Sequence, residues 1–444
     1  MRLSRALVGL TAVAFAASAA LPASAHEPWD PDDNSDSIPP PPAASPADGI
    51  SKNMHLLSTS EHRGGVNSDL AFKGDLAFAG HYGGFRVVDL SEPGEPVVLA
   101  DVHCNGPQGD VTVYGDLLFL SVDTPQSTEG CEGSRNVTAK TEGAFEGVRV
   151  FDISNPAAPV FLKGVRTDCG SHTNTLVPGD GGTAYLYIAS YPLSASGIGP
   201  DCQAPFEQIS VIQVDGDDAA AGLAARVVAE PEIKGIDLFG EQFGVTPFFA
   251  CHDITVLSPK DTAAAACLSQ GQLWDISDPL QPVVTENIDT PNVDIWHSAA
   301  YTPDGKYVTF GDEYFGQPKD PYGALWTYEV ADPSTALSYY RIPRDEPSTY
   351  HNFNYVPTGD GYILVSSAYG SGTSVVDLTD PTAPKEIAYF DMQSNAWSTY
   401  WYNGLIVAND ISRGLDTLRL SSKSVAGARR LPMLNPQTQD YLIG

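Results

Sequence analysis

A seven-residue phrase recurs along this chain and decides the fold: LWDISDP at residues 273–279, VVDLSEP at 87–93, VFDISNP at 150–156 and VVDLTDP at 375–381. Three degenerate copies fill the gaps: VIQV at 211–214, TYEV at 327–330 and TLRL at 417–420. The copies follow one another at intervals of roughly 40 to 60 residues, a period typical of stacked supersecondary units.

Each copy reads as a tight turn between the third and fourth strands of a unit. Asp and Ser side chains bond nearby amides in such turns and Pro fixes φ, while Val, Ile, Phe and Tyr in the flanks favour strands. The Ala-rich stretch 219–225 is predicted to be a short insertion. We therefore predict an all-β fold, a seven-bladed β-propeller of four-stranded blades spanning residues 51–444. A strand at residues 55–60 is expected to complete the last blade, beside strands within 397–421.

The phrase resembles the LVIVD repeat of secreted bacterial β-propellers. The resemblance runs from about Met54 onward and is weakest in the three degenerate copies, where Gln213, Glu329 and Arg419 replace the turn Asp. It implies a propeller fold and an extracytoplasmic setting, and it implies no single activity.

The first 50 residues predict export. Arg2 and Arg5 precede an apolar stretch, and the small residues Ala23–Ser24–Ala25 form a cleavage site, so residues 1–25 are predicted to be a signal peptide. Residues 26–50 are rich in Pro, Asp and Ser and predict a disordered linker. No later segment resembles a membrane span. We expect a secreted, extracellular protein that does not insert into membranes.

The charge balance bears on the partners. Twenty-four Lys and Arg against 55 Asp and Glu give a net charge of −31. Such a surface repels phosphate backbones, so no nucleic acid is expected as a partner. The partners left open are a small molecule, a glycan or an extracellular protein on one face of a monomer.

Six cysteines in an exported chain are expected to pair. Six allow 15 connectivities, and the positions of the cysteines in the predicted blades favour one of them. The predicted bridges are Cys104–Cys131, Cys169–Cys202 and Cys251–Cys267. The alternative, a structural Cys–His metal site, is disfavoured because no C-x-x-C spacing occurs.

Four histidines occupy the same place in four successive units, at the start of a strand-like run that ends in a turn. They are His172, His252, His297 and His351. The matching positions of the other three units carry Asn67, Gly109 and Trp397. Because the first strands of propeller blades line the central channel, we expect the four rings to gather at one end of it and to share one ion.

Neutral imidazole suits Fe, Cu and Zn, and a transition-metal ion is the predicted cofactor. Imidazole ligands usually donate their second N–H to a carboxylate or carbonyl. Candidates for such supporting roles on the same face are His81, Asp123, Asp253, Asp294, Asp312 and Glu313. The alternative is that the histidines line a wet channel and bond water or carbonyls.

Two classes of function remain open. One is a metal-dependent oxidase, oxygenase or hydrolase, with catalytic residues unassigned. Carotenoid cleavage oxygenases and selenium-binding methanethiol oxidases are similar in architecture, although no sequence motif of either is present. The other is a non-catalytic propeller that binds protein or glycan by stacking on aromatic side chains. The candidate aromatic residues are Tyr191, Tyr314, Phe315, Tyr322, Trp397, Tyr400 and Trp401.

Overall fold

The computed structural model describes residues 49–443 except 61–64, 193–194, 236–237, 240–247, 291–292, 315–320 and 344–347. The predicted signal peptide and residues 26–48 of the predicted linker lie outside the described residues. The last two residues of that linker form a short strand, β1 (Gly49–Ile50), which pairs with β26 (Lys385–Asp391).

Antiparallel sheets of four consecutive strands make up the fold. The first two are β3 (Asn67–Lys73), β4 (Leu76–His81), β5 (Gly84–Asp89) and β6 (Val97–His103), then β7 (Val111–Tyr114), β8 (Leu117–Gln126), β9 (Phe145–Asp152) and β10 (Val160–Arg166). The next two are β11 (Thr173–Pro178), β12 (Thr183–Ala189), β13 (Ser210–Asp215) and β14 (Arg226–Ala229), then β15 (Ile254–Leu257), β16 (Thr262–Cys267), β17 (Gln270–Asp275) and β18 (Val283–Ile288). Then follow β19 (Trp296–Tyr301), β20 (Tyr307–Asp312), β21 (Leu325–Glu329) and β22 (Ser338–Tyr340).

Nine further strands form one sheet. Its members are β23 (Thr349–Tyr355), β24 (Ile363–Tyr369), β25 (Gly372–Asp377) and β26, with β1 at one edge, and β27 (Ala396–Tyr402), β28 (Leu405–Asp410), β29 (Gly414–Leu420) and β2 (Met54–Thr59). A single parallel bridge, Asn352 to Ser398, joins the two antiparallel groups.

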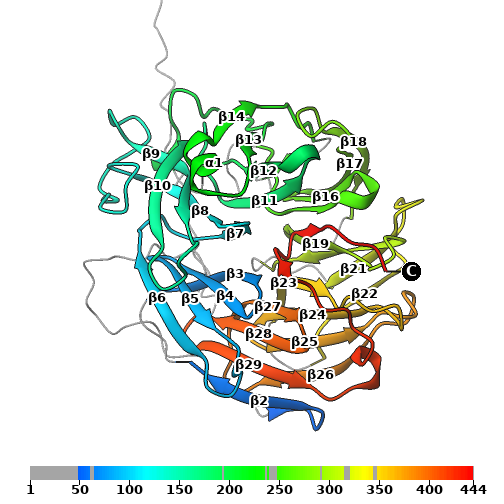
Figure 1. Ribbon diagram of the computed structural model, residues 1–444. Helices are drawn as coiled ribbons and strands as arrows, with labels where there is room; N and C mark the ends of the chain where they lie inside the picture. Colours follow the sequence, from blue (N-terminus) through cyan, green and yellow to red (C-terminus); the bar gives the residue numbers. More distant parts are fainter. Residues whose placement is uncertain are drawn as a thin grey trace, which may run out of the picture.

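The sheets radiate from a common centre, which makes the protein an all-β propeller (Figure 1). The first strands contact one another in the order β3, β7, β11, β15, β19, β23, β27 and back to β3. Fourth strands such as β6, β10 and β18 lie at the rim (Figure 1). The one α-helix of the described chain, α1 (Ala219–Ala224), is capped by the Asp218 carboxylate and forms the Ala-rich insertion. No helix in the described ranges has the length and hydropathy of a transmembrane span.

The repeated phrase forms the turn that the sequence predicts. In all four strong copies the Asp carboxylate accepts a hydrogen bond from the amide two residues later, at 2.8–2.9 Å. Just before this turn the pairing of third and fourth strands shifts register, as between Leu273 and Trp274 and between Val375 and Val376. Such bulges strengthen the local twist of a strand. The phrase therefore encodes both the turn and the twist of the outer strands.

The ring closes where the sequence predicts. Strand β2 pairs antiparallel with β29, with Met54 opposite Leu420 and Thr59 opposite Asp416. The hydroxyls of Ser58 and Thr417 lie 2.6 Å apart across this seam, and both bond the carbonyl of Pro93 in the neighbouring sheet. A strand from before the first unit thus completes the last one.

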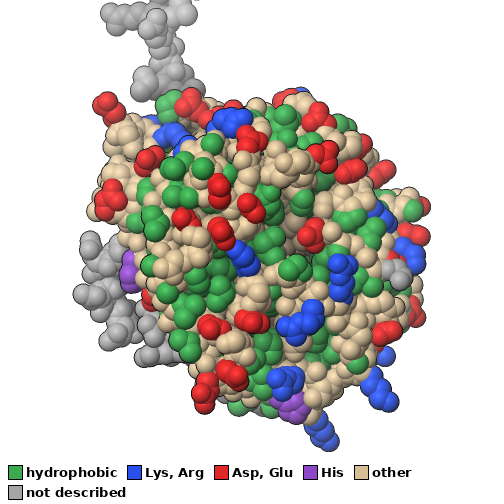
Figure 2. Space-filling model, in the orientation of Figure 1, with side chains coloured by type: hydrophobic (Ala, Val, Ile, Leu, Met, Phe, Trp, Pro, Cys, Tyr) green, Lys and Arg blue, Asp and Glu red, His purple; other side chains and the backbone are tan. Residues whose placement is uncertain are grey.

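Residues 431–443, the closing segment, cross the centre of the ring at the inner-strand ends remote from the histidines (Figure 1). Its strand β30 (Met433–Leu434) pairs with β3, and β31 (Thr438–Gln439) runs parallel to β15. The Asn435 amide bonds both Val113 N and Val113 O at 2.8 Å, and the Gln439 amide bonds Tyr301 N and O at 2.8 and 2.9 Å. On this face histidine colour is visible only near the rim (Figure 2). This closure is not predicted from the sequence.

We predict that Asn435→Ala and Gln439→Ala each lower the free energy of unfolding by about 1–3 kcal/mol, because each strands a buried backbone N–H and C=O without partners. Urea denaturation followed by fluorescence measures the change. Gln281→Ala is the control, since this exposed side chain bonds only the carbonyl of Leu280. Wild-type stability in both variants would contradict a sealing role for the closing segment.

Candidate metal centre

The four histidines lie at the starts of the inner strands, as the sequence predicts. His172 directly precedes β11 and His252 lies two residues before β15, and their amides donate to Ala189 O and Ala266 O at 2.9 and 2.7 Å. His297 lies inside the register shift between Trp296 and Ser298 at the start of β19. His351 lies in a similar shift in β23, between Tyr350 and Phe353. Bulges re-aim side chains, and we attribute the inward direction of these two rings to them.

The rings form a row across adjoining inner strands. Ring centroids are 4.4 Å apart for His172 and His252, 3.9 Å for His252 and His297, and 3.9 Å for His297 and His351. All four residues are buried, with at most 4% of their surface exposed. Neither of the groups whose ligand atoms all lie within 4.8 Å of one another contains all four histidines, so the predicted four-ligand arrangement around a single ion stays a prediction.

Two of the candidate carboxylates lie at one end of the row. Asp123 Oδ2 lies 3.0 Å from His172 Nδ1, and Asp253 Oδ1 lies 3.0 Å from His252 Nδ1. The two Nε2 atoms then face each other at 2.8 Å. Two imidazole lone pairs repel at that distance, so either one nitrogen carries hydrogen or the pair shares a cation. Burial holds the pKa of Asp123 well above its usual range.

Glu313 lies at the other end of the row. Its carboxylate oxygens lie 3.7 Å from His297 Nε2 and 3.8 Å from His351 Nε2. Burial, reinforced by Asp253 and Asp312, raises the pKa of Glu313 to about 8. The neighbouring Asp312 has a different role, because its carboxylate accepts the backbone amides of Asp294, Ile295 and Gly323 at 2.9–3.1 Å. Burial raises the pKa of Asp312 to about 7 despite these bonds.

His351 is held by protein partners at both nitrogens. Nδ1 donates to Trp397 O at 2.6 Å, and Nε2 lies 2.8 Å from the hydroxyl of Tyr369. An imidazole nitrogen has a single lone pair, and here the Tyr369 hydroxyl is positioned to use it. His351 is therefore less available to an ion than His252 or His297.

Two groups of three residues could hold a metal ion among the described residues. They are His252–Asp253–His297 and His297–Glu313–His351, each with ligand atoms within 4.8 Å of one another. Only the first group lies entirely on a cavity of about 10 Å³, roughly the volume of one water or one ion. The full lining of this cavity is Asp69, Gln108, Asp110, Thr173, His252, Asp253, His297, His351, Asn352 and Trp397.

The cavity lining contains three Asp and three His residues and neither Lys nor Arg. Burial raises the pKa of Asp69. Burial also raises the pKa of Asp110 well above its usual range, and the negative charge of Asp69 raises it further. Asp253 Oδ2 is buried and has no hydrogen-bond partner among the described residues. A buried carboxylate oxygen without a partner is costly, and a cation is the ligand that would relieve this cost.

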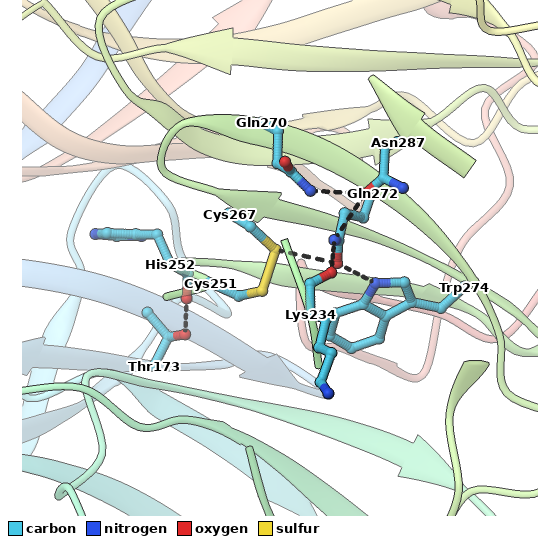
Figure 3. Close-up of a disulfide and its surroundings, with 9 residues drawn as sticks. All are labelled: Thr173, Lys234, Cys251, His252, Cys267, Gln270, Gln272, Trp274 and Asn287. Atoms are coloured by element: carbon cyan, nitrogen blue, oxygen red, sulfur yellow. Dashed lines mark hydrogen bonds between the residues drawn. A yellow bond between two sulfur atoms is a disulfide. The ribbon is translucent and has the colours of Figure 1, made fainter. Parts of the chain in front are cut away.

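The three disulfides agree with the predicted pairing: Cys104–Cys131, Cys169–Cys202 and Cys251–Cys267. The third bridge anchors the residue next to His252 (Figure 3). Thr173 fixes the same peptide from the neighbouring sheet, because its hydroxyl donates to His252 O at 2.7 Å (Figure 3). The His252 backbone is thus held by a covalent bridge and by hydrogen bonds on both sides.

The remaining two predicted candidates on the histidine side of the ring are His81 and Asp294. His81 belongs to a separate cluster, where Nδ1 accepts from Gly83 N and Nε2 lies 3.6 Å from Asp101. Burial lowers the pKa of His81. Asp294 is buried beside Asp312 and contributes its backbone amide to that carboxylate.

The predicted aromatic face is mostly buried. Tyr191, Trp397, Tyr400 and Trp401 are at most 6% exposed, so they cannot stack on an external ligand. Tyr191 packs on His172 with ring centroids 5.1 Å apart, and Trp397 packs on His351 at 4.9 Å. Phe315 lies outside the described residues. Of the described candidates, Tyr314 and Tyr322 remain partly accessible. Their rings are tilted with centroids 4.6 Å apart, and the Arg341 guanidinium lies over the Tyr322 ring.

Sequence reasoning missed several residues of this centre, chiefly Gln108, Tyr369, Asp69 and Asp110. The one available signal was position: Gln108 directly precedes Gly109, which stands where four other units carry histidine. A separate surface cleft of about 450 Å³, lined by Glu129, Phe145, Arg166 and their neighbours, was also not anticipated.

Comparisons with known proteins support the fold and the repeat. Residues 64–103 and 144–167 match the family model of the LVIVD repeat. No curated protein matches the sequence. The β-propeller domain of Cps50 (Swd1) from Myceliophteria thermophila is similar in structure, with a TM-score of 0.53, 12% identity, and coverage of 83% of this chain and 100% of that one. A protein from Lactobacillus plantarum gives a TM-score of 0.55 at 13% identity, covering 83% and 96%. At such identities the likeness concerns the fold alone.

We predict that the buried residue Glu146, near Asp123, makes the protein less stable as the pH rises. Burial raises the pKa of Glu146 to about 8, against a usual value of 4.5. Folding therefore favours the protonated form, and this contribution to stability is present below about pH 4.5 and lost as pH rises through 8. Glu146→Gln should match wild type near pH 4.5 and exceed its melting temperature at pH 8. If Glu146→Gln and wild type had the same melting temperature at both pH values, the raised pKa of Glu146 would be refuted.

Proposed function

We propose that this protein is a secreted, seven-bladed propeller that binds one transition-metal ion at the end of its central channel. The blade number follows if the nine-stranded sheet is divided at its single parallel bridge, which gives seven antiparallel groups of four. Three disulfides in the described chain fit an oxidising compartment, in line with the export signal expected from the sequence.

The observation that carries the metal proposal is the cavity beside His252, Asp253 and His297. It is the size of one small ion, and its lining includes carboxylates and imidazoles but neither Lys nor Arg. Asp253 lines it, and the buried Oδ2 of this residue has no hydrogen-bond partner among the described residues. A divalent cation would neutralise the buried charge and accept the lone pairs together. Imidazole with carboxylate suits Fe²⁺, Zn²⁺ and, with a different geometry, Cu²⁺.

The number of protein ligands favours a reactive site over a closed structural one. Structural zinc sites are completed by four protein ligands, whereas catalytic sites keep a position for water or substrate. His252, Asp253 and His297 supply three ligands. His172, Asp123, His351 and Glu313 would then orient the ligands or handle protons nearby. This arrangement supports a metal-dependent oxidase, oxygenase or hydrolase.

Burial limits the size of the reactant. The histidines are nearly inaccessible to solvent, and the closing segment seals the other end of the channel. A reactant must therefore enter from the histidine side and be small, or the loops there must move. The alternative of a glycan- or protein-binding propeller has less support, because most of its aromatic residues are buried.

The direct test is metal content. We expect untagged protein, stripped with chelator and reloaded with Fe²⁺, Cu²⁺ or Zn²⁺, to hold one ion per chain by elemental analysis and to melt at a higher temperature, because an ion that binds only the folded state stabilises it. The double variant His252→Ala/His297→Ala should lose the ion and the stabilisation.

The matched control is His55→Ala, since His55 is an exposed histidine of β2 whose Nε2 lies 3.1 Å from the hydroxyl of Ser421. It should bind like wild type. If wild-type protein holds no stoichiometric metal and no added ion raises its melting temperature, the histidines are a polar channel lining. The binding-propeller alternative would then take precedence.

A further inference from the structure

We infer that Gln108 is a further ligand of this metal centre, supplying its side-chain carbonyl oxygen from the sheet that lacks a histidine. The inference rests on the proposed function and deepens it, because it makes the donor set two imidazole nitrogens and two oxygens. It concerns a residue outside both of the three-residue groups described above.

Steric constraints explain why this sheet cannot offer a histidine at the matching position. Gly109 has φ +62°, and a Cβ there would lie 2.4 Å from the carbonyl oxygen of His81 and 3.2 Å from that of Gly84. No side chain fits in that space. The preceding residue, Gln108, lines the cavity instead, and its side-chain amide reaches the ring of His172.

The backbone of Gln108 adopts an unfavourable conformation to do so. Its φ is +61°, in the left-handed region that favours Gly and Asn and is uncommon for Gln. Non-glycine residues in this region persist where the surrounding structure over-determines them, and they cluster at functional sites. Gln108 is also only 3% exposed, so its amide has been taken out of water.

The two ends of the amide have different environments. Nε2 lies 3.0 Å from His172 Nε2 and can donate to it. Oε1 is buried and has no hydrogen-bond partner among the described residues. Asp253 Oδ2 is in the same state on the same cavity. Two buried oxygens without donors on one ion-sized cavity point to a cation that both would bind.

The donor set narrows the choice of metal. Carboxylate and amide oxygens are hard ligands, whereas Cu⁺ prefers thiolate and thioether. Two imidazoles with two oxygens suit Zn²⁺, Fe²⁺, Mn²⁺ or Cu²⁺. Because Gln108 would be a fourth protein ligand, an open position for water or substrate requires a coordination number of five or six.

The test compares two glutamines of the same backbone conformation. Gln393 also has a left-handed φ, +57°, but it is exposed. Glycine adopts such φ values without strain, so Gln108→Gly and Gln393→Gly should both fold with an apo melting temperature at or above that of wild type. By calorimetric titration with Zn²⁺, we expect Gln108→Gly to bind at least tenfold more weakly, and Gln393→Gly to bind like wild type.

A third variant separates a ligand from a hydrogen-bond donor. Glutamate cannot donate to His172 but keeps an oxygen at the cavity, so Gln108→Glu should bind Zn²⁺ at least as tightly as wild type. The visible spectrum of the Co²⁺-loaded protein should change in Gln108→Gly, because the coordination number changes, and not in Gln393→Gly.

The outcomes separate the two proposals. Wild-type Zn²⁺ affinity in Gln108→Gly, with binding still lost in His252→Ala/His297→Ala, would overturn the role of Gln108 and leave the metal centre standing. Equal weakening in Gln108→Gly and Gln108→Glu would reduce Gln108 to a donor that positions His172. Absence of binding in wild type would overturn the metal centre itself.

Discussion

The hydrogen-bonded seam between β2 and β29 holds the rest of the structure in place. It joins residues such as His55 and Ser421 that are 366 positions apart in the sequence. Because this seam closes the ring, each inner strand has a neighbour on both sides and a fixed angular position. Residues at the same place in successive units must then meet around the channel, and equivalent positions in a one-dimensional repeat become adjacent positions in space.

That constraint also explains why the centre combines positions that differ slightly between units. Each unit offers a strand start, and a bulge or an extra turn sets the direction of its side chain. The bulge in β19 carries His297, and the bulge in β27 carries Trp397. Before β7, Gln108 itself has a left-handed backbone conformation. The fold supplies a ring of similar positions, and local backbone irregularities influence which side chains face the channel.

The sequence was sufficient for features that repeat and insufficient for features that occur once. The turn phrase, the ring-closing strand and the three disulfides follow from period and register, and each agrees with the structure. The histidine row followed from the same reasoning. The departures arise from single contacts: Tyr369 and Trp397 O engage His351, Asp312 binds backbone amides, and burial removes Trp397, Tyr400 and Trp401 from any surface. Such contacts depend on side-chain packing between sheets, which no periodicity reports.

Docking of the closing segment depends on correct assembly of the ring. Along a single short stretch it engages β3, Val113, Leu176, β15 and Tyr301, which belong to five successive sheets. These partners have the required spacing only when the sheets stand at the angles of the finished ring. A ring with one blade missing, or with a blade exchanged between two molecules, would offer them at the wrong separations. The segment would then stay undocked, and an incorrectly assembled propeller would be left with an open base that proteases and chaperones can recognise.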